Sequence, residues 1–176
     1  MKKRIEKAYW LWLEISRADK KKIQKIKNLI NQKLKGPRFD IHLTLFGPYL
    51  KMNQKEIKLI KKISKKINKF KIQLIKYDFT DKKYTSLFIK VKKSKKLNLI
   101  RKKFNKTNYL KQYSKYHPHI SLYYGEKSTA LKKKIISELP KLNKTVTIDK
   151  LSISNINEKI NKWKIVKRIR LSEKKN

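Results

Sequence analysis

A short pattern that joins a histidine to a hydroxyl two residues later occurs twice in this 176-residue chain. His42 precedes Thr44, and His119 precedes Ser121. Side chains alternate between the faces of a strand, so each histidine and its hydroxyl point the same way if both stretches are strands. Two such strands brought face to face would gather two imidazoles and two hydroxyls around one point. This set can supply a general acid, a general base and hydrogen-bond donors to a phosphate.

The elements that must position these motifs follow from the apolar pattern of the chain. The residues around the two motifs predict strands over 39–46 and 119–124. Other strands are predicted over 7–15, 70–79, 84–91, 145–153 and 163–171, and helices over 23–34, 57–67, 97–104 and 131–139. The mixture predicts an α+β fold.

A weak internal repeat connects these elements. The order strand, helix, histidine strand occurs from Trp12 to His42 and again from Phe88 to His119, at offsets of 30 and 31 residues. Two lobes related by a pseudo-twofold axis would place both histidine strands at a central cleft. We therefore expect one bilobal domain over residues 1–171, with antiparallel sheets lining the cleft and helices outside. Residues 172–176 are expected to be a disordered tail.

The formal net charge of +39 is extreme and indicates a polyanionic partner such as RNA or a composition rich in Lys, Ile and Asn. Only six of the 51 basic residues are Arg, the usual choice for bidentate phosphate recognition, and the lysines are spread along the chain. Both facts favour compositional bias. In either case the electric field attracts anionic substrates, less so at high salt.

The chain has no cysteine, which excludes disulfides and thiolate metal sites. The apolar run 8–13 after the basic residues near the N-terminus is short and contains two tryptophans, so it predicts a strand rather than a signal sequence. No segment approaches the roughly 20 apolar residues of a membrane span. We expect a cytoplasmic, monomeric protein without a membrane partner.

The paired motifs and their flanks resemble the 2H phosphoesterase superfamily, in particular its small cyclic nucleotide phosphodiesterases. Gly36-Pro37-Arg38-Phe39 leads into the first motif, and Pro118 directly precedes the second histidine. Tyr124 follows Ser121 by three, and the surroundings of Trp12 and Trp163 also fit. The resemblance implies a bilobal α+β fold and metal-independent hydrolysis of a cyclic phosphodiester without a cofactor. Implied substrates are ADP-ribose 1″,2″-cyclic phosphate and nucleoside 2′,3′-cyclic phosphates.

Opening a cyclic phosphodiester requires an activated water on one side of phosphorus and a proton for the leaving oxygen on the other. Two histidines can do both near neutral pH, because the ordinary histidine pKa is about 6.5. We assign His119 as general base and His42 as general acid. Thr44 and Ser121 are expected to donate hydrogen bonds to the non-bridging phosphate oxygens.

Further residues are candidates for binding. Tyr124 is a candidate for the phosphate, although strand alternation places Tyr123 on the His119 face, so Tyr124 requires a bulge or a strand end. Trp12 and Tyr84 are candidates for stacking on a base at the cleft mouth, with a core role as the alternative. Arg38 is interpreted as a turn residue that is able to reach the phosphate.

His117 and His119 are spaced like a metal pair, but with only three histidines and no cysteine the further ligands of a zinc site are missing. The sequence therefore predicts no metal. Three other functions stay open: an RNA-processing enzyme acting on RNA 2′,3′-cyclic phosphate ends, a ligase-like activity on RNA ends, and a non-catalytic RNA-binding domain.

Overall fold

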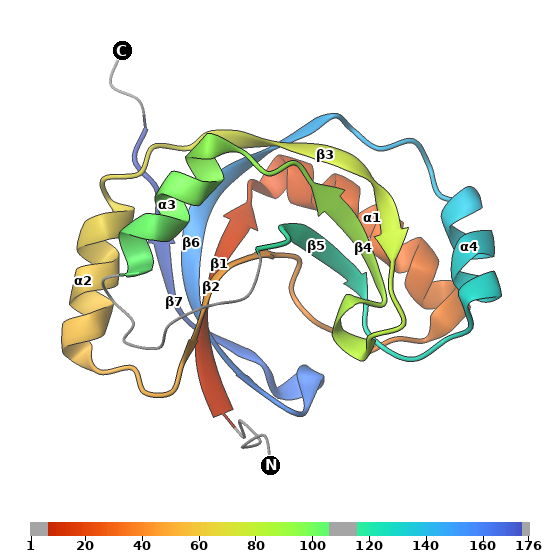
Figure 1. The fold of residues 1–176 in the computed structure, drawn as a ribbon, viewed down its shortest axis with the longest axis horizontal. Helices are drawn as coiled ribbons and strands as arrows, with labels where there is room; N and C mark the ends of the chain where they lie inside the picture. The colour runs from red at the N-terminus through yellow and green to blue at the C-terminus, as the bar shows by residue number, and fades with distance from the viewer. Residues whose placement is uncertain (1–6, 106–115, 174–176) are drawn as a thin grey trace.

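A computed structural model describes residues 7–105 and 116–173 of the chain. Its elements are, in order, β1 (Lys7–Ile15), α1 (Arg17–Leu34), β2 (Leu43–Tyr49), α2 (Gln54–Ser64), β3 (Phe70–Phe79), η1 (Lys83–Thr85), β4 (Leu87–Val91), α3 (Lys95–Asn105), β5 (His119–Tyr123), α4 (Thr129–Ser137), β6 (Thr145–Asn157), η2 (Ile160–Lys162) and β7 (Lys164–Arg170). Figure 1 shows α2 and α3 on one side of the molecule and α4 on the other, with the strands curving between them. The predicted α+β class is confirmed.

The seven strands form one sheet in the order β1-β2-β5-β4-β3-β6-β7, and every pair of named strands is antiparallel. Because β6 pairs with β3 through Thr145–Ile148 and also pairs with β1, the first six strands close into a ring. Each predicted lobe therefore shares this sheet with the other instead of holding a sheet of its own. Helices cover the outside.

The internal repeat is visible in the pairing. The first half runs β1-α1-β2-α2-β3 and the second half β4-α3-β5-α4-β6. β1 lies between β2 and β6, while β4 lies between β5 and β3. The third strand of each half thus pairs with the first strand of the other half. The helices are exchanged as well, because α1 packs against β5 and α3 packs against β2.

The helices begin where side chains cap them. The Ser16 hydroxyl accepts a hydrogen bond from the Asp19 amide at the start of α1, and Asn53 and Glu56 form a capping box at α2. Isoleucine and leucine side chains on the inner face of α1 are buried at Ile23, Ile26, Ile30 and Leu34. This apolar stripe fastens α1 to the sheet and fixes the segment that follows it, residues 35–42, which leads to the first histidine.

Several boundaries differ from the sequence expectations. The expected strand over 84–91 begins only at Leu87, because residues 83–85 form η1. The first histidine strand begins at Leu43, not at position 39, so His42 lies just before β2, and β2 continues past Gly47 to Tyr49. Residues 39–42 have the apolar pattern of a strand but run beneath the cleft as an extended loop. At the other end, Ser172 forms a bridge with Asn68 although it was assigned to the tail. Residues 174–176 lie outside the described residues.

Candidate active site

The two histidine motifs meet where β2 and β5 pair side by side in the sheet. Leu43 is the register partner of Ile120, and both side chains are buried in the core. Since the strands are antiparallel, His42 comes beside Ser121, and Thr44 comes beside His119. The expectation that the strands would lie face to face is therefore wrong. They are neighbours in one sheet, and the four polar residues belong to one face of it.

Both imidazoles are held in the same way. Nδ1 of His42 lies 2.7 Å from the carbonyl oxygen of Asp40, and Nδ1 of His119 lies 2.8 Å from the carbonyl oxygen of His117. A carbonyl oxygen only accepts hydrogen bonds, so each Nδ1 carries the proton and donates it. Each ring therefore presents its second nitrogen, Nε2, away from the backbone. A neutral ring of this tautomer has an Nε2 able to accept a proton.

An aromatic ring supports each imidazole at equivalent positions of the repeat. Trp12 is the register partner of Thr44, and its ring stacks on His42 with the centroids 3.6 Å apart and the planes 10° apart. Phe88 is the register partner of Ser121, and its ring meets His119 edge to face at 5.2 Å. The support of His42 is flat and close, whereas that of His119 is looser.

Burial lowers the pKa of both histidines. The pKa of His42, whose side chain is 5% exposed, falls to about 3, first because of desolvation and then because a positive charge on His119 would repel its own. The pKa of half-buried His119 also falls below its ordinary value, again chiefly through desolvation. The carbonyl hydrogen bonds oppose both shifts. Both rings are thus neutral at pH 7 in the free protein.

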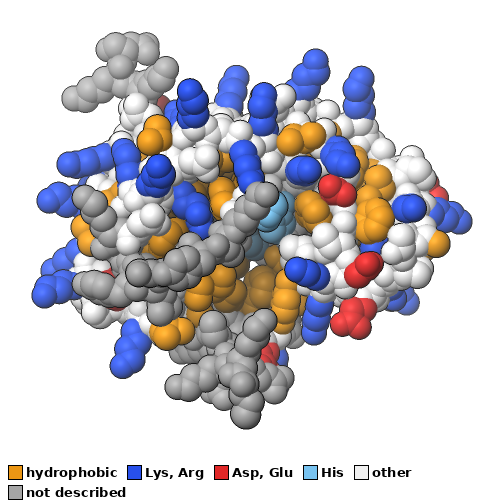
Figure 2. Space-filling model, viewed as in Figure 1, with side chains coloured by type: hydrophobic (Ala, Val, Ile, Leu, Met, Phe, Trp, Pro, Cys, Tyr) orange, Lys and Arg blue, Asp and Glu red, His pale blue; other side chains and the backbone are white. Residues whose placement is uncertain are grey.

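A cleft of about 530 Å³ opens at the two histidines. It is large enough for a nucleotide. Its walls contain Ala8, Trp10, Trp12, His42, Thr44, Tyr84, Thr85, His119, Tyr124, Ile156, Asn157, Glu158 and Trp163. Figure 2 shows histidine atoms at the centre of this face beside apolar side chains, with Lys and Arg spread around the periphery. No Lys or Arg that the structure describes lines the cleft, and Glu158 is its one carboxylate.

The two hydroxyls of the motifs are placed differently. Thr44 lines the cleft and is partly exposed, and its backbone carbonyl accepts a 3.1 Å hydrogen bond from the Tyr116 hydroxyl. Ser121 is 4% exposed and forms a hydrogen bond with the Tyr124 side chain, which itself lines the cleft. Tyr124 therefore stands between Ser121 and the cleft.

Tyr124 reaches the cleft because β5 ends before it. The strand stops at Tyr123, and Gly125 adopts a φ of +143°. A Cβ at Gly125 would lie 2.6 Å from the Tyr123 hydroxyl, so only glycine fits. Burial raises the pKa of Tyr124 to about 12, which keeps its phenol protonated and able to donate at neutral pH.

The two residues expected to stack on a base also differ in their exposure. Tyr84 lies at the cleft wall, 47% exposed, and its ring meets Tyr124 edge to face at 6.0 Å. Trp12 lines the cleft but is only 2% exposed, and one of its faces is covered by His42. It shields His42 from solvent, and stacking of Trp12 on a base stays a prediction.

Sequence reasoning missed two tryptophans and one lysine. Trp10 and Trp163 are partly exposed cleft residues, and the first could have been found because Trp10 and Trp12 share one face of β1. Lys27, on α1, is 2% exposed. Its ammonium donates to the Phe39 carbonyl and lies 3.2 Å from the centroid of the Phe39 ring, and burial lowers its pKa to about 8. A buried lysine among so many exposed ones has no sequence signal.

Lys27 fastens the loop that carries the first histidine. Its acceptor Phe39 packs 4.1 Å from Tyr124, and the next residue, Asp40, holds Nδ1 of His42. The second half also has a buried lysine, at a position that is not equivalent in the repeat: Lys132 of α4 is 1% exposed and donates to the Thr80 carbonyl at 2.9 Å. The segment after Thr80 carries Tyr84 and Thr85 to the cleft wall.

Among the described residues, no group of three or more His, Cys, Asp or Glu side chains is close enough to hold a metal ion. The same part of the chain holds no helix of the length and apolarity needed to cross a membrane.

A family model of the 2′-5′ RNA ligase superfamily matches residues 13–159, which include both motifs. The chain belongs to this superfamily. Its members are 2H phosphoesterases, so the resemblance inferred from the motifs is confirmed. They are phosphodiesterases, which supports a phosphodiesterase or RNA-processing role for this chain. No curated protein matches the chain in sequence.

Solved structures of low sequence identity share the fold. LigT of E. coli complexed with 3′-AMP has a TM-score of 0.63 at 13% identity, covering 95% of this chain and 99% of LigT. The protein TT0787 of Thermus thermophilus has a TM-score of 0.65 at 10% identity, covering 96% and 100%. Usb1 of Kluyveromyces marxianus has a TM-score of 0.52 at 12% identity, covering 96% and 98%.

Proposed function

We propose that this protein is a metal-independent phosphodiesterase that opens a nucleotide cyclic phosphate to a phosphomonoester by acid–base catalysis of His42 and His119. The observation that carries the proposal is the pair of imidazoles held alike by backbone carbonyls, each with Nε2 available at one cleft. A buried histidine with a purely structural role normally has hydrogen-bond partners for both ring nitrogens. The two imidazoles, of the same tautomer and beside a threonine and a tyrosine hydroxyl, meet the geometric needs of phosphoryl chemistry.

In this mechanism a water attacks phosphorus while His119 Nε2 takes its proton. The phosphorus–oxygen ester bond on the opposite side breaks, and His42 Nε2–H gives a proton to the leaving sugar oxygen. Thr44 and Tyr124 donate to the non-bridging oxygens, whose charge must be held in the transition state. Ser121 supports this step through the hydroxyl of Tyr124 rather than by direct contact.

Exposure supports this order of roles. His119 is half-buried, so a water reaches it from solvent, whereas His42 is sealed against Trp12. A sealed acid delivers its proton to the leaving oxygen and not to water. Because the pKa of His42 is about 3 in the free protein, the charged form depends on the bound phosphate anion, which raises that pKa.

The cleft supports a nucleotide substrate. Its volume and its aromatic wall of Trp10, Trp163 and Tyr84 suit a base and a sugar. LigT has been solved with 3′-AMP, a nucleoside monophosphate, bound. ADP-ribose 1″,2″-cyclic phosphate and nucleoside 2′,3′-cyclic phosphates are the proposed substrates, and the predicted monomeric state and cytoplasmic location remain predictions.

The test is hydrolysis of both classes of cyclic phosphate in EDTA, with the His42→Ala/His119→Ala double variant as control. We expect turnover by the wild type alone, and the position of the phosphate in the product identifies the broken bond. Equal activity of the double variant would contradict the two-histidine mechanism, and loss of wild-type activity in EDTA would contradict its metal independence.

The net charge of +39 favours one second candidate, an enzyme that acts on RNA ends carrying a 2′,3′-cyclic phosphate. The chemistry at the histidines is the same. A short RNA with such an end, assayed beside the mononucleotide, decides between them by the ratio of the two kcat/KM values.

A further inference from the structure

A second hollow, of about 560 Å³, adjoins the cleft. Tyr124 and Glu158 line both the cleft and this hollow, so the two spaces are neighbours at these residues. Unlike the cleft, it is lined by two cationic residues, Arg38 and Lys83. Arg38 also lines a smaller hollow on the side of Trp12 and Trp163.

Both cations stand on segments that are fastened to the cleft wall. Arg38 directly precedes Phe39, whose ring packs on Tyr124 and whose carbonyl is held by buried Lys27. Lys83 begins η1, and its carbonyl accepts a 3.0 Å hydrogen bond from the Gly125 amide. The backbone of both residues is therefore fixed beside the cleft wall, and their exposed side chains line the second hollow.

Their charges are available to a ligand. Within residues 7–105 and 116–173, no acidic side chain forms an ion pair with Arg38 or Lys83. The cleft itself offers a phosphate only neutral donors. A second negative group on the substrate therefore finds its counter-charge on the Arg38 and Lys83 side.

We propose that Arg38 and Lys83 form a second phosphate subsite, which takes a phosphate attached to the 5-position oxygen of the same ribose whose cyclic phosphate lies at the histidines. This extends the role of Arg38 beyond the turn and rests on the proposed function. The shared chemistry is a phosphate ester on the other side of that ribose from the reacting group. It has two sources: the backbone phosphate of an RNA 3′ end, or the pyrophosphate of ADP-ribose cyclic phosphate.

The experiment compares three substrates: a nucleoside 2′,3′-cyclic phosphate, a dinucleotide ending in a 2′,3′-cyclic phosphate, and ADP-ribose 1″,2″-cyclic phosphate. The variant is Arg38→Ala/Lys83→Ala. Neither residue touches the reacting groups, so kcat/KM for the mononucleotide stays within about twofold. For at least one of the substrates with a second phosphate, kcat/KM falls about tenfold, mainly through KM. The substrate that loses activity identifies the source.

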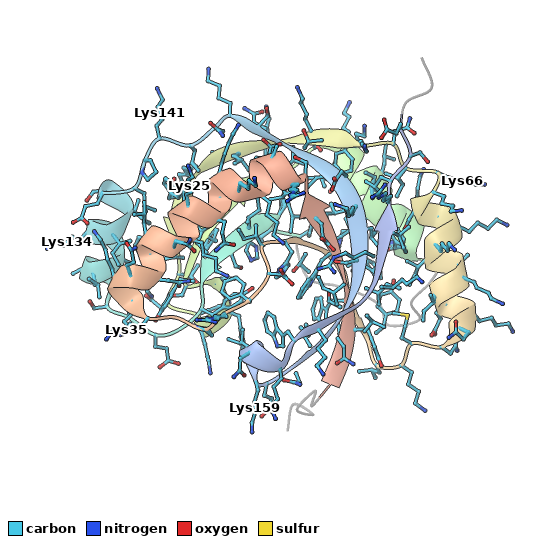
Figure 3. The ribbon with its side chains drawn as sticks, turned by 180° about the vertical axis from the view of Figure 1, so that it is seen from behind. Lys25, Lys35, Lys66, Lys134, Lys141 and Lys159 are labelled. Atoms are coloured by element: carbon cyan, nitrogen blue, oxygen red, sulfur yellow. The ribbon has the colours of Figure 1, made fainter. Side chains whose placement is uncertain are left out.

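A matched control removes the same charge elsewhere. Lys66, in the turn after α2, and Lys134, on α4, are exposed at opposite ends of the molecule, as Figure 3 shows. Lys66→Ala/Lys134→Ala lowers the net charge equally, so it reports the effect of the overall field. An equal loss for all three substrates, or an equal loss in both double variants, would overturn the subsite. So would unchanged kcat/KM for both substrates with a second phosphate.

A binding measurement separates this proposal from the proposed function. Dinucleotides that end in a 2′-phosphate or a 3′-phosphate are the two possible product forms and need no catalysis, so both are titrated. Their affinities are measured at several salt concentrations. We expect the Arg38→Ala/Lys83→Ala variant to bind about tenfold more weakly, with a salt slope reduced by about one to two. Absence of turnover with this pattern would refute only the phosphodiesterase. Unchanged affinity and slope would refute the subsite.

Discussion

The two halves of the molecule hold their histidines by the same kind of contacts but bury them to different degrees. In each half, a histidine donates Nδ1–H to a carbonyl two residues earlier and rests on an aromatic ring from the neighbouring strand. In the first half the ring is a stacked Trp12, and Lys27 is buried behind the loop. In the second half the ring is an edge-on Phe88, and the histidine is half-buried.

This difference shows how the same backbone support can give the two histidines different chemical roles. Identical backbone support fixes the tautomer of both rings, and unequal burial separates their tendencies to hold a proton. The half with the flat tryptophan makes the imidazole that gives up its proton readily. The half with the looser phenylalanine leaves its imidazole open to water.

We expect the largest loss of activity when either imidazole is removed. His42→Asn and His119→Asn each retain a side-chain donor but lose Nε2, and we expect kcat to fall by about 10² to 10⁴. The double variant should lose far less than the product of the two, because the rings act as a unit. Single-turnover kinetics measure this, with thermal unfolding as the control for folding. Fully multiplicative losses would show that the rings act separately.

Substitutions of Thr44 and Ser121 test whether the hydroxyls of the two halves differ in their contact with the phosphate. Thr44→Val removes a donor at the cleft wall, and we expect kcat to fall about 10²-fold. Ser121→Ala removes a group that stands behind Tyr124, and we expect a loss of about tenfold or less. Steady-state kinetics of Thr44→Val, Ser121→Ala and Tyr124→Phe rank the three hydroxyls by the loss of kcat that each substitution causes. A larger effect of Ser121→Ala than of Thr44→Val would mean that Ser121 itself contacts the phosphate.

Substitutions of the buried residues Lys27 and Lys132 test the difference between the two halves at positions away from the reacting groups. Lys27→Met removes the bond to Phe39, so we expect kcat to fall about tenfold, with partial rescue in Lys27→Arg. The charge of Lys27 also lowers the pKa of His42, so that pKa should rise in Lys27→Met. Lys132→Met, the matched control, should raise KM through Tyr84 and leave His42 unchanged. Rate assays and the NMR titration of His42 distinguish these patterns.

The smallest effect is on the pH profile. Both histidine pKa values are lowered, so the singly protonated pair needed for catalysis becomes scarce in the free enzyme as pH rises past the pKa of His119, below 6.5. We expect kcat/KM to decline as the pH rises through the lowered pKa of His119. In the complex the phosphate anion raises both pKa values, so kcat should hold to higher pH. Coincident profiles for kcat and kcat/KM would contradict this.

Local features of the sequence predicted much of the fold. The expected strand over 7–15 matches β1, because a short aromatic-rich apolar run defines it, and the expected strand over 70–79 matches β3, because alternating apolar residues define it. The offsets from Trp12 and Phe88 to the histidines indicated the repeat, but not that these two rings contact the imidazoles. The exchange of β3 and β6 between halves was not predictable, because strand pairing over such separations leaves no local pattern.

The sequence predicted which residue types form the site, but not how deeply each side chain is buried. Trp12 was expected at the mouth, but β2 and β6 on both its sides and the stacked His42 bury it. Ser121 and Tyr124 were expected to act in parallel, but the strand end at Tyr123 sets one behind the other. Such outcomes depend on neighbouring elements that the spacing of a motif does not contain.

The exchange of strands has a consequence for synthesis on the ribosome. The first strand, β1, waits for a partner that emerges more than a hundred residues later, because Lys7–Ile15 pairs with residues 148–157. Until then the first half lacks the strand that completes its sheet, although α3 and both histidine strands have already been made. A translation product that ends before β6 therefore holds both histidines but no closed ring. Activity arises in a single late step, after β6 has joined β1 to β3.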